Sequence, residues 1–307
     1  MIRSILVPLD GSTFAEQAIP LAATIAERHR ASLGLAVVHP WGPSEDAPRP
    51  GSSADRELRE GEGIYLNRLV QKVAAAYRVP VDEIVLDGSS TGRTLVRFTG
   101  DRRFDLVVAT THDHGKLALF FSTGVARQLA DDSPVTSLLI KPQVYSFPAG
   151  TGEFSRVLIG LDGSPGAECA LDAAIALASP SARIVLAGVL PLKAPAQLRA
   201  DAERYLDIAA EHARSSGRSV ESVVLTGSNV AAALVSYAYE NAIDLIAVTT
   251  RSRRRLARTV FASVADSLLH RAAVPVLVCH NQPVRTKSAG EASISSTVSR
   301  RHEAHSR

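Results

Sequence analysis

The feature that most constrains the fold of this chain is an internal repeat. The segment SILVPLDGS at 4–12 returns as SRVLIGLDGS at 155–164, so the two Asp-Gly-Ser triplets stand 152 residues apart. The segment FDLVVATTH at 104–112 likewise returns as IDLIAVTTR at 243–251. Because 307 residues are about twice the usual length of a domain, each copy is expected to fold as one domain.

Both copies alternate short β-branched runs with longer segments of helical period, which predicts an α/β fold with a five-stranded parallel sheet and crossover helices in each domain. The predicted strands are 3–8, 33–38, 81–86, 105–110, 135–140, 156–161, 183–189, 220–225, 244–249 and 275–279. The predicted helices are 13–29, 55–78, 91–102, 122–131, 166–179, 196–216, 229–241 and 260–271. We expect the first domain at 1–147 and the second at 154–283.

The net charge of +3 belongs to the C-terminal tail. Five of the 34 Lys and Arg residues and two of the 31 Asp and Glu residues lie in 284–307, so the rest of the chain has 29 of each. The tail is rich in Ser and poor in large apolar residues, which predicts disorder. A neutral body argues against a dedicated nucleic-acid-binding protein.

Hydropathy and cysteine content indicate the compartment. No stretch approaches the ~18 consecutive apolar residues of a membrane span, and the start, MIRSILVPLD, has neither a basic segment nor a cleavable apolar stretch. The two cysteines, Cys169 and Cys279, lie inside apolar patterns, which excludes a disulfide framework and is compatible with a reducing compartment. We expect a soluble cytoplasmic protein without membrane contact, and Cys279 as a buried structural thiol.

Ligands of open parallel sheets bind outside the carboxyl ends of the strands, where strand order reverses. The residues to inspect therefore follow the first and fourth strands of each copy, where the copies match best. There, Asp-Gly-Ser and the pattern Asp-Leu-(Val/Ile)-x-(Ala/Val)-Thr-Thr resemble the universal stress protein family, over residues 1 to about 283. The resemblance implies a tandem member with doubly wound domains of strand order 3-2-1-4-5.

Family dimers join at their final strands, and such sheet edges need a partner. The resemblance therefore implies that 134–140 and 275–279 pair within the chain, so that the two domains form an intrachain pseudo-dimer near Ile140 and Val276. A homodimer of whole chains is left open.

The nucleotide-binding branch of the family carries Gly-x2-Gly-x9-Gly-(Ser/Thr)-Val after the fourth strand, because glycines let backbone amides approach phosphate oxygens closely. The aligned residues are Thr110, Asp113, Thr123, Gly124 and Val125 in the first copy and Thr249, Ser252, Ala262, Ser263 and Val264 in the second. Every required glycine is replaced in the first copy, whereas the second keeps the Ala-Ser-Val end. The phosphate loop is therefore predicted to be degenerate in both domains.

Charge distinguishes the two loops. Asp113 would lie beside the triphosphate, and two like unit charges 4 Å apart repel by about 4 kcal/mol at an effective dielectric near 20. The second copy instead carries Arg251, Arg253, Arg254, Arg255 and Arg258. These arginines are read as a solvated basic face, as an anion or nucleotide-phosphate site, or as a nucleic-acid contact. A retained anionic ligand is expected in the second domain.

The resemblance also implies contacts to the rest of the nucleotide. These positions are Pro8, Asp10, Val37, Ala109 and His112 in the first domain and Gly160, Asp162 and Val248 in the second. Asp10 and Asp162 read equally well as turn and N-cap residues that start the first helix of each domain.

Two short motifs are compatible with other chemistries. Gly88-Ser89-Ser90-Thr91-Gly92 fits the nucleophile elbow of a hydrolase, with Asp105 and His112 downstream, but a helix-capping turn explains it as well. The run His112-Asp113-His114 offers metal ligands but lacks a fourth from elsewhere. We expect neither a catalytic nor a metal site.

The sequence thus favours a non-enzymatic stress-response protein that binds an unidentified protein partner, with nucleotide binding weak or lost. The alternative is an ATP-binding sensor with slow hydrolysis, in which Asp162, Ser263 and the arginines of the second domain hold ATP. No other cofactor is expected.

Overall fold

The computed structural model describes residues 2–41, 47–102, 104–111, 124–141, 152–164, 166–250, 262–280 and 296–300. In the first domain the strands are β1 (Ser4–Leu9), β2 (Ser32–Pro40), β3 (Val81–Gly88), β4 (Leu106–Thr110) and β5 (Thr136–Ile140). The helices are the short 3-10 helix η1 (Ala15–Gln17), α1 (Ala18–His29), α2 (Ser53–Ala76), α3 (Thr91–Arg102) and α4 (Gly124–Asp132).

The second domain repeats this order. Its strands are β6 (Phe154–Gly160), β7 (Ala178–Leu190), β8 (Ser219–Thr226), β9 (Leu245–Thr250) and β10 (Val276–His280). Its helices are α5 (Cys169–Leu177), α6 (Ala196–Arg214), α7 (Val230–Glu240) and α8 (Ala262–Arg271). The alternation predicted from the sequence is confirmed in both domains.

The predicted boundaries are wrong between the helix expected at 166–179 and the strand expected at 183–189, which are α5 from Cys169 and β7 from Ala178. The helix expected at 166–179 ends at Leu177, and the backbone is already extended at Ala178, where β7 begins. Pro180 explains the early end, because the residue before a proline is disfavoured in the helical conformation.

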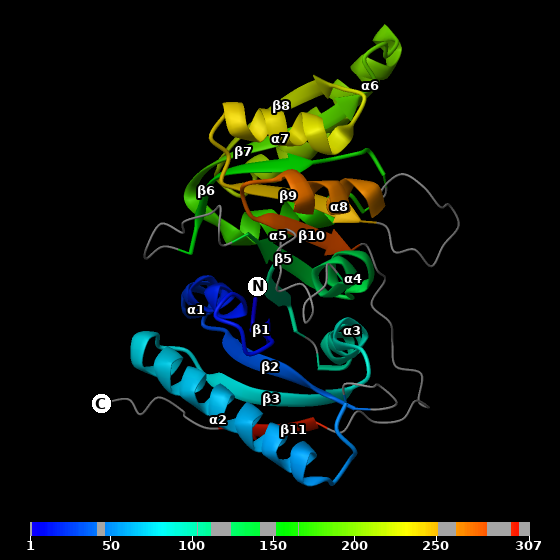
Figure 1. The fold of residues 1–307 in the computed structure, drawn as a ribbon. Helices are drawn as coiled ribbons and strands as arrows, with labels where there is room; N and C mark the ends of the chain where they lie inside the picture. Colours follow the sequence, from blue (N-terminus) through cyan, green and yellow to red (C-terminus); the bar gives the residue numbers. More distant parts are fainter. Residues whose placement is uncertain are drawn as a thin grey trace.

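The strands form one continuous sheet (Figure 1). A further strand from the tail, β11 (Ser296–Arg300), pairs antiparallel with β3, and the order is β11-β3-β2-β1-β4-β5-β10-β9-β6-β7-β8. Each domain has the expected order 3-2-1-4-5 with parallel neighbours. The antiparallel pair β5 and β10, with Leu138 opposite Leu277, joins the two domains and confirms the intrachain pairing.

The tail strand corrects the expectation of a disordered C-terminus. Residues 296–300 are a strand whose register places Ser296 opposite Leu86 and Arg300 opposite Asp82. A strand edge offers unpaired backbone groups, so even a segment poor in large apolar residues can add to it. The other residues of 284–307 lie outside the described ranges.

The helices divide between the two faces of the sheet (Figure 1). Side chains of α1, α2, α5 and α6 pack in one apolar cluster, and those of α3, α4, α7 and α8 in another. Because both faces are covered, the inner strands are largely apolar, as at 5–9 in β1 and 245–248 in β9. Since the helices cover both faces, a binding site is expected at the carboxyl ends of the strands.

Among the helices described, none combines the length and apolar character of a membrane span.

Two hydrogen bonds of the same kind stabilise the domain junction. The ring of His280, at the end of β10, donates from Nε2 to the carbonyl oxygen of Ala130 in α4, at 2.8 Å. The Nζ of Lys141, just after β5, donates to the carbonyl oxygen of His270 in α8, at 2.6 Å. Each final strand is thus tied to the last helix of the other domain.

The contact of His280 predicts a loss of stability in mild acid. Burial lowers the pKa of His280 below its ordinary 6.5, while its Nδ1 is buried and has no hydrogen-bond partner among the residues described. Below pH 6.5 the unfolded chain therefore takes up a proton at this ring before the folded chain does. The free energy of unfolding should be fully retained above pH 6.5 and fall as the pH drops below it.

The measurement is the midpoint of thermal unfolding between pH 8 and pH 5 in the wild type and in His280→Gln. The variant should show a shallower dependence on pH over this interval. His212→Gln, which changes a histidine on the surface, serves as the control. An unchanged slope in His280→Gln would show that this ring is not responsible.

Candidate functional site

The fold brings the predicted site residues of each domain to one edge of the sheet. β1 lies beside β4, and Leu9 at the end of β1 pairs with Val37 of β2. In the second domain Gly160, at the end of β6, pairs directly with Val248 of β9. The strand ends named from the resemblance are therefore neighbours in both domains.

Both Asp-Gly-Ser triplets form the same turn. Oδ1 of Asp10 accepts hydrogen bonds from the backbone N–H and the hydroxyl of Ser12, and Oδ1 of Asp162 accepts one from the backbone N–H of Ser164 at 2.9 Å. The glycines between them have φ of 83° and 71°, a left-handed conformation that favours glycine. The turn explains these triplets without a ligand, and a contact of Asp10 or Asp162 to a nucleoside stays a prediction.

The two aspartates differ in exposure. Asp162 is exposed, whereas Asp10 is half-buried. In the second domain Thr249, the penultimate residue of β9, donates its hydroxyl to the carbonyl oxygen of Ala167 at 3.0 Å, ahead of α5. The end of β9 is thus tied to the segment that follows Asp162.

The phosphate loops themselves lie largely outside the described residues. This holds for His112, Asp113, Thr123, Arg251 and Ser252, and for the other four arginines of 251–258. The described residues do include the C-terminal ends of both loops. Gly124 and Ala262 are the first residues of α4 and α8, Ser263 follows Ala262, and Val125 and Val264 belong to the apolar cluster on that face.

The hydrolase alternative does not fit the fold. Ser90 follows the carboxyl end of β3, whereas Asp105 precedes the amino end of β4. Asp105 accepts hydrogen bonds from the backbone N–H groups of Arg3 and Ser4 at the start of β1. In parallel strands the carboxyl and amino ends lie on opposite sides of the sheet, so Ser90 and Asp105 cannot belong to one triad.

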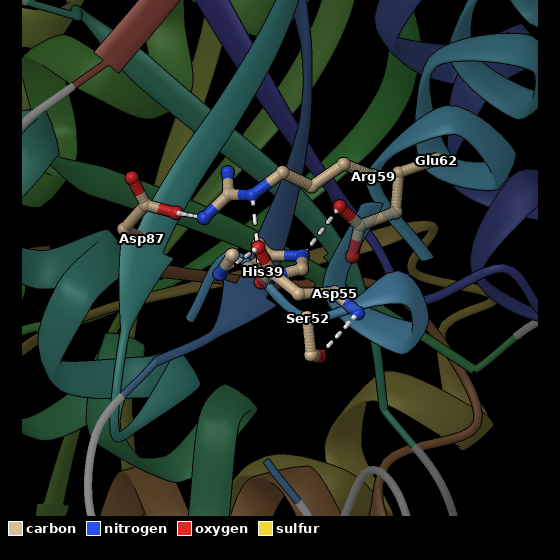
Figure 2. Close-up of polar contacts among 7 residues, drawn as sticks. His39, Ser52, Asp55, Arg59, Glu62 and Asp87 are labelled. Carbon is tan, nitrogen blue, oxygen red and sulfur yellow. Dashed lines mark hydrogen bonds and ion pairs between the residues drawn. The ribbon is translucent and has the colours of Figure 1, made fainter. Parts of the chain in front are cut away.

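Sequence reasoning missed a buried cluster of charged side chains at the carboxyl end of β2 (Figure 2). The ring of His39 is fully buried and lies between two carboxylates of α2. Its Nδ1 is 2.9 Å from Oε2 of Glu62, and its Nε2 is 3.0 Å from Oδ1 of Asp55. A carboxylate oxygen therefore lies within hydrogen-bonding distance of each ring nitrogen.

The cluster continues toward β3 and fixes the start of α2 (Figure 2). Arg59 lies 2.7 Å from Asp87 of β3 and 3.7 Å from Asp55. The hydroxyl of Ser52 caps the helix by accepting from the backbone N–H of Asp55. The spacing of Asp55, Arg59 and Glu62 places all three on one side of a helix, and this was the signal available in the sequence.

The two carboxylates are held differently. The backbone N–H of Gly51 and the hydrogen bond from His39 lower the pKa of Asp55. Burial raises the pKa of Glu62, against the hydrogen bond from His39. Because both nitrogens of His39 face carboxylates, neither is available to a metal ion or a substrate, and the cluster is structural. Across the described ranges, no three His, Cys, Asp or Glu side chains are arranged to hold a metal ion.

Comparisons with known proteins agree with the fold. Residues 1–141 and 153–280 each match the family model described as Universal stress protein family. A universal stress protein from Archaeoglobus fulgidus has 18% identity and a TM-score of 0.69, over 90% of this chain and 96% of that one. A putative universal stress protein from Pseudomonas aeruginosa has 17% identity and a TM-score of 0.56, over 91% and 93%. None of the curated proteins matches the chain significantly. The chain belongs to the universal stress protein family, as a member with two tandem domains.

Proposed function

We propose that this chain is a non-enzymatic regulatory protein of the stress response, which acts in the cytoplasm by binding a protein partner and has weak or lost nucleotide binding. The observation that supports this proposal most is that the fold of the family is intact, whereas the loops after the fourth strand of each domain lack the glycines of its nucleotide-binding branch. Both domains keep the family's sheet, but Thr110 and Thr249 stand where the first loop glycine is expected. A side chain there keeps backbone amides from approaching phosphate oxygens closely.

The surroundings of His39 and Asp105 support the same interpretation. The ring of His39 is enclosed by carboxylates, and Asp105 is held by backbone N–H groups at the opposite edge. Neither group is placed as a base beside a nucleophile, which a hydrolytic function would require.

A second candidate function is an ATP-binding sensor with slow hydrolysis that uses the second domain. Two observations favour this domain over the first. Asp162 is exposed where Asp10 is half-buried, and five arginines stand in 251–258. Guanidinium groups bind phosphate through paired hydrogen bonds, so charge would replace the missing glycine geometry.

Thermal unfolding with millimolar Mg-ATP distinguishes the two functions. A ligand at 100 times its Kd stabilises by about 2.7 kcal/mol, which raises the Tm of a protein of this size by several degrees. Under the proposal the Tm stays within about one degree of that without ATP. A larger rise that is lost in Asp162→Ala and kept in the matched variant Asp10→Ala would replace the proposal by the ATP sensor.

The nucleotide content of freshly purified protein, released with acid and read by mass spectrometry, is an independent check. If affinity is measurable, Arg251→Ala should weaken it while Asp113→Gly leaves it unchanged. The opposite pattern would place the phosphate site in the first domain.

A further inference from the structure

The chain has two cysteines, and the fold brings them together in the second domain. Cys169 begins α5, Cys279 lies in β10, and α5 packs on β10. The Sγ of Cys169 is 3.6 Å from the hydroxyl oxygen of Thr249, which is the residue paired with Cys279 across β9 and β10. Cys279, which was expected only as a buried structural thiol, therefore has the second cysteine of the chain near it.

The two thiols lie in different surroundings. Cys279 is 1% exposed, within the apolar cluster under α5, and the hydroxyl of Thr136 in the first domain donates to its Sγ at 3.8 Å. Cys169 is half-buried at the rim of the same cluster. A small reagent can thus reach Cys169 from solvent, whereas Cys279 is reached through Cys169.

Each thiol shifts the pKa of the other, and the two shifts have opposite directions. A hydrogen bond from the Cys279 thiol, which outweighs burial, lowers the pKa of Cys169 to about 7. The same interaction and complete burial raise the pKa of Cys279. Near neutral pH, Cys169 is therefore the nucleophilic thiolate and Cys279 the protonated neighbour.

We propose that Cys169 and Cys279 are a redox-active pair that closes a reversible disulfide when the protein meets a hydroperoxide. The sulfur of Cys169 attacks the peroxide, so that an S–O bond forms, the O–O bond breaks, and the leaving oxygen departs as water or an alcohol after taking a proton. The Cys279 thiol then loses its proton and attacks the Cys169 sulfur. The S–S bond forms, the S–O bond breaks, and the hydroxide departs with that proton as water.

In total, two thiols lose two electrons and two protons, and the peroxide is reduced. The disulfide closes a loop of 110 residues between α5 and β10. A cross-link over so long a loop restricts the unfolded chain strongly, so the oxidised protein should unfold several degrees above the reduced one.

The test treats the full chain with hydrogen peroxide at neutral pH. The expected result is the loss of both titratable thiols, a mass lower by two hydrogen atoms, and a linked peptide pair containing Cys169 and Cys279, all reversed by dithiothreitol. A mass higher by two or three oxygen atoms at Cys169, with Cys279 still alkylatable after unfolding, would overturn the proposal. A disulfide-linked dimer of chains would overturn it as well.

Two single variants separate the roles. In Cys279→Ala, Cys169 should stop at the sulfenic acid, which dimedone traps, and the pH midpoint of its alkylation should move upward because the hydrogen bond is gone. In Cys169→Ser, Cys279 should remain unoxidised in the folded chain. Equal reactivity of Cys279 in the wild type and in Cys169→Ser would contradict the assigned order. The wild-type mass alone decides the proposal if either variant fails to fold.

Discussion

Replacing His39 by Leu is expected to lower the free energy of unfolding by about 3 to 5 kcal/mol, because the change leaves buried carboxylate without its partner. The ring is fully buried, and its two nitrogens lie 2.9 Å and 3.0 Å from carboxylate oxygens of Glu62 and Asp55. Leu fills a similar volume, so the loss measures the polar contacts rather than a cavity. Urea unfolding followed by far-ultraviolet circular dichroism gives the value.

The destabilisation by His39→Leu should depend on pH, and the direction of this dependence follows from the pKa of Glu62. Burial raises the pKa of Glu62 above its ordinary 4.5, so this carboxyl favours the folded state below pH 4.5 and loses that contribution as the pH rises through its folded-state pKa. Without His39 the cost of the charged form increases. His39→Leu should therefore be more destabilised relative to wild type at pH 8 than at pH 5.

The matched control is the double variant His39→Leu with Glu62→Leu, which removes one buried carboxylate and should recover part of the lost stability. Glu62→Gln alone should cost less than His39→Leu, since the amide oxygen still accepts from Nδ1. A loss below about 1 kcal/mol in His39→Leu would show that the cluster is solvated rather than buried.

The sequence predicted the fold well because its signals are local and repeated. The apolar run of β1 recurs in β6, and the same is true of β4 and β9, so each copy checks the assignment of the other. The antiparallel pairing of β5 with β10 could not be predicted from such local signals. No periodicity shows which strand edges meet, and that expectation came from resemblance to the family.

The features that were missed depend on contacts between distant segments. His39 is the penultimate residue of β2, and nothing in the strand itself shows that α2 covers its ring with Glu62 and Asp55. The distance between the two cysteines along the chain hides that α5 lies on β10. In the candidate nucleotide site the sequence left Asp162 open between a nucleoside contact and a turn with an N-cap. The turn is present, but the N-cap residue of α5 is Glu168, and the contact to a ligand stays a prediction.

Replacing Leu277 by Ala, in the second domain, is expected to destabilise the first domain together with the second. Leu277 is fully buried in β10 and lies opposite Leu138 of β5 across the junction. Removing a buried Leu side chain costs about 2 to 5 kcal/mol. Because one continuous sheet and one apolar cluster span both domains, this cost should lower the stability of the whole molecule rather than of one half.

The single tryptophan makes this testable without a label. Trp41 follows β2 in the first domain, with the Arg59 guanidinium 5.8 Å from its ring, so its fluorescence reports the first domain, while far-ultraviolet circular dichroism reports both. In Leu277→Ala both signals should shift to lower urea concentration together, as in a two-state transition. The reciprocal variant Leu138→Ala should do the same, and the double variant should fall short of the sum, because the two residues lie opposite each other in the pair of β5 and β10. A Trp41 transition unmoved by Leu277→Ala, with a biphasic circular dichroism curve, would mean that the joined sheet holds two domains that unfold separately.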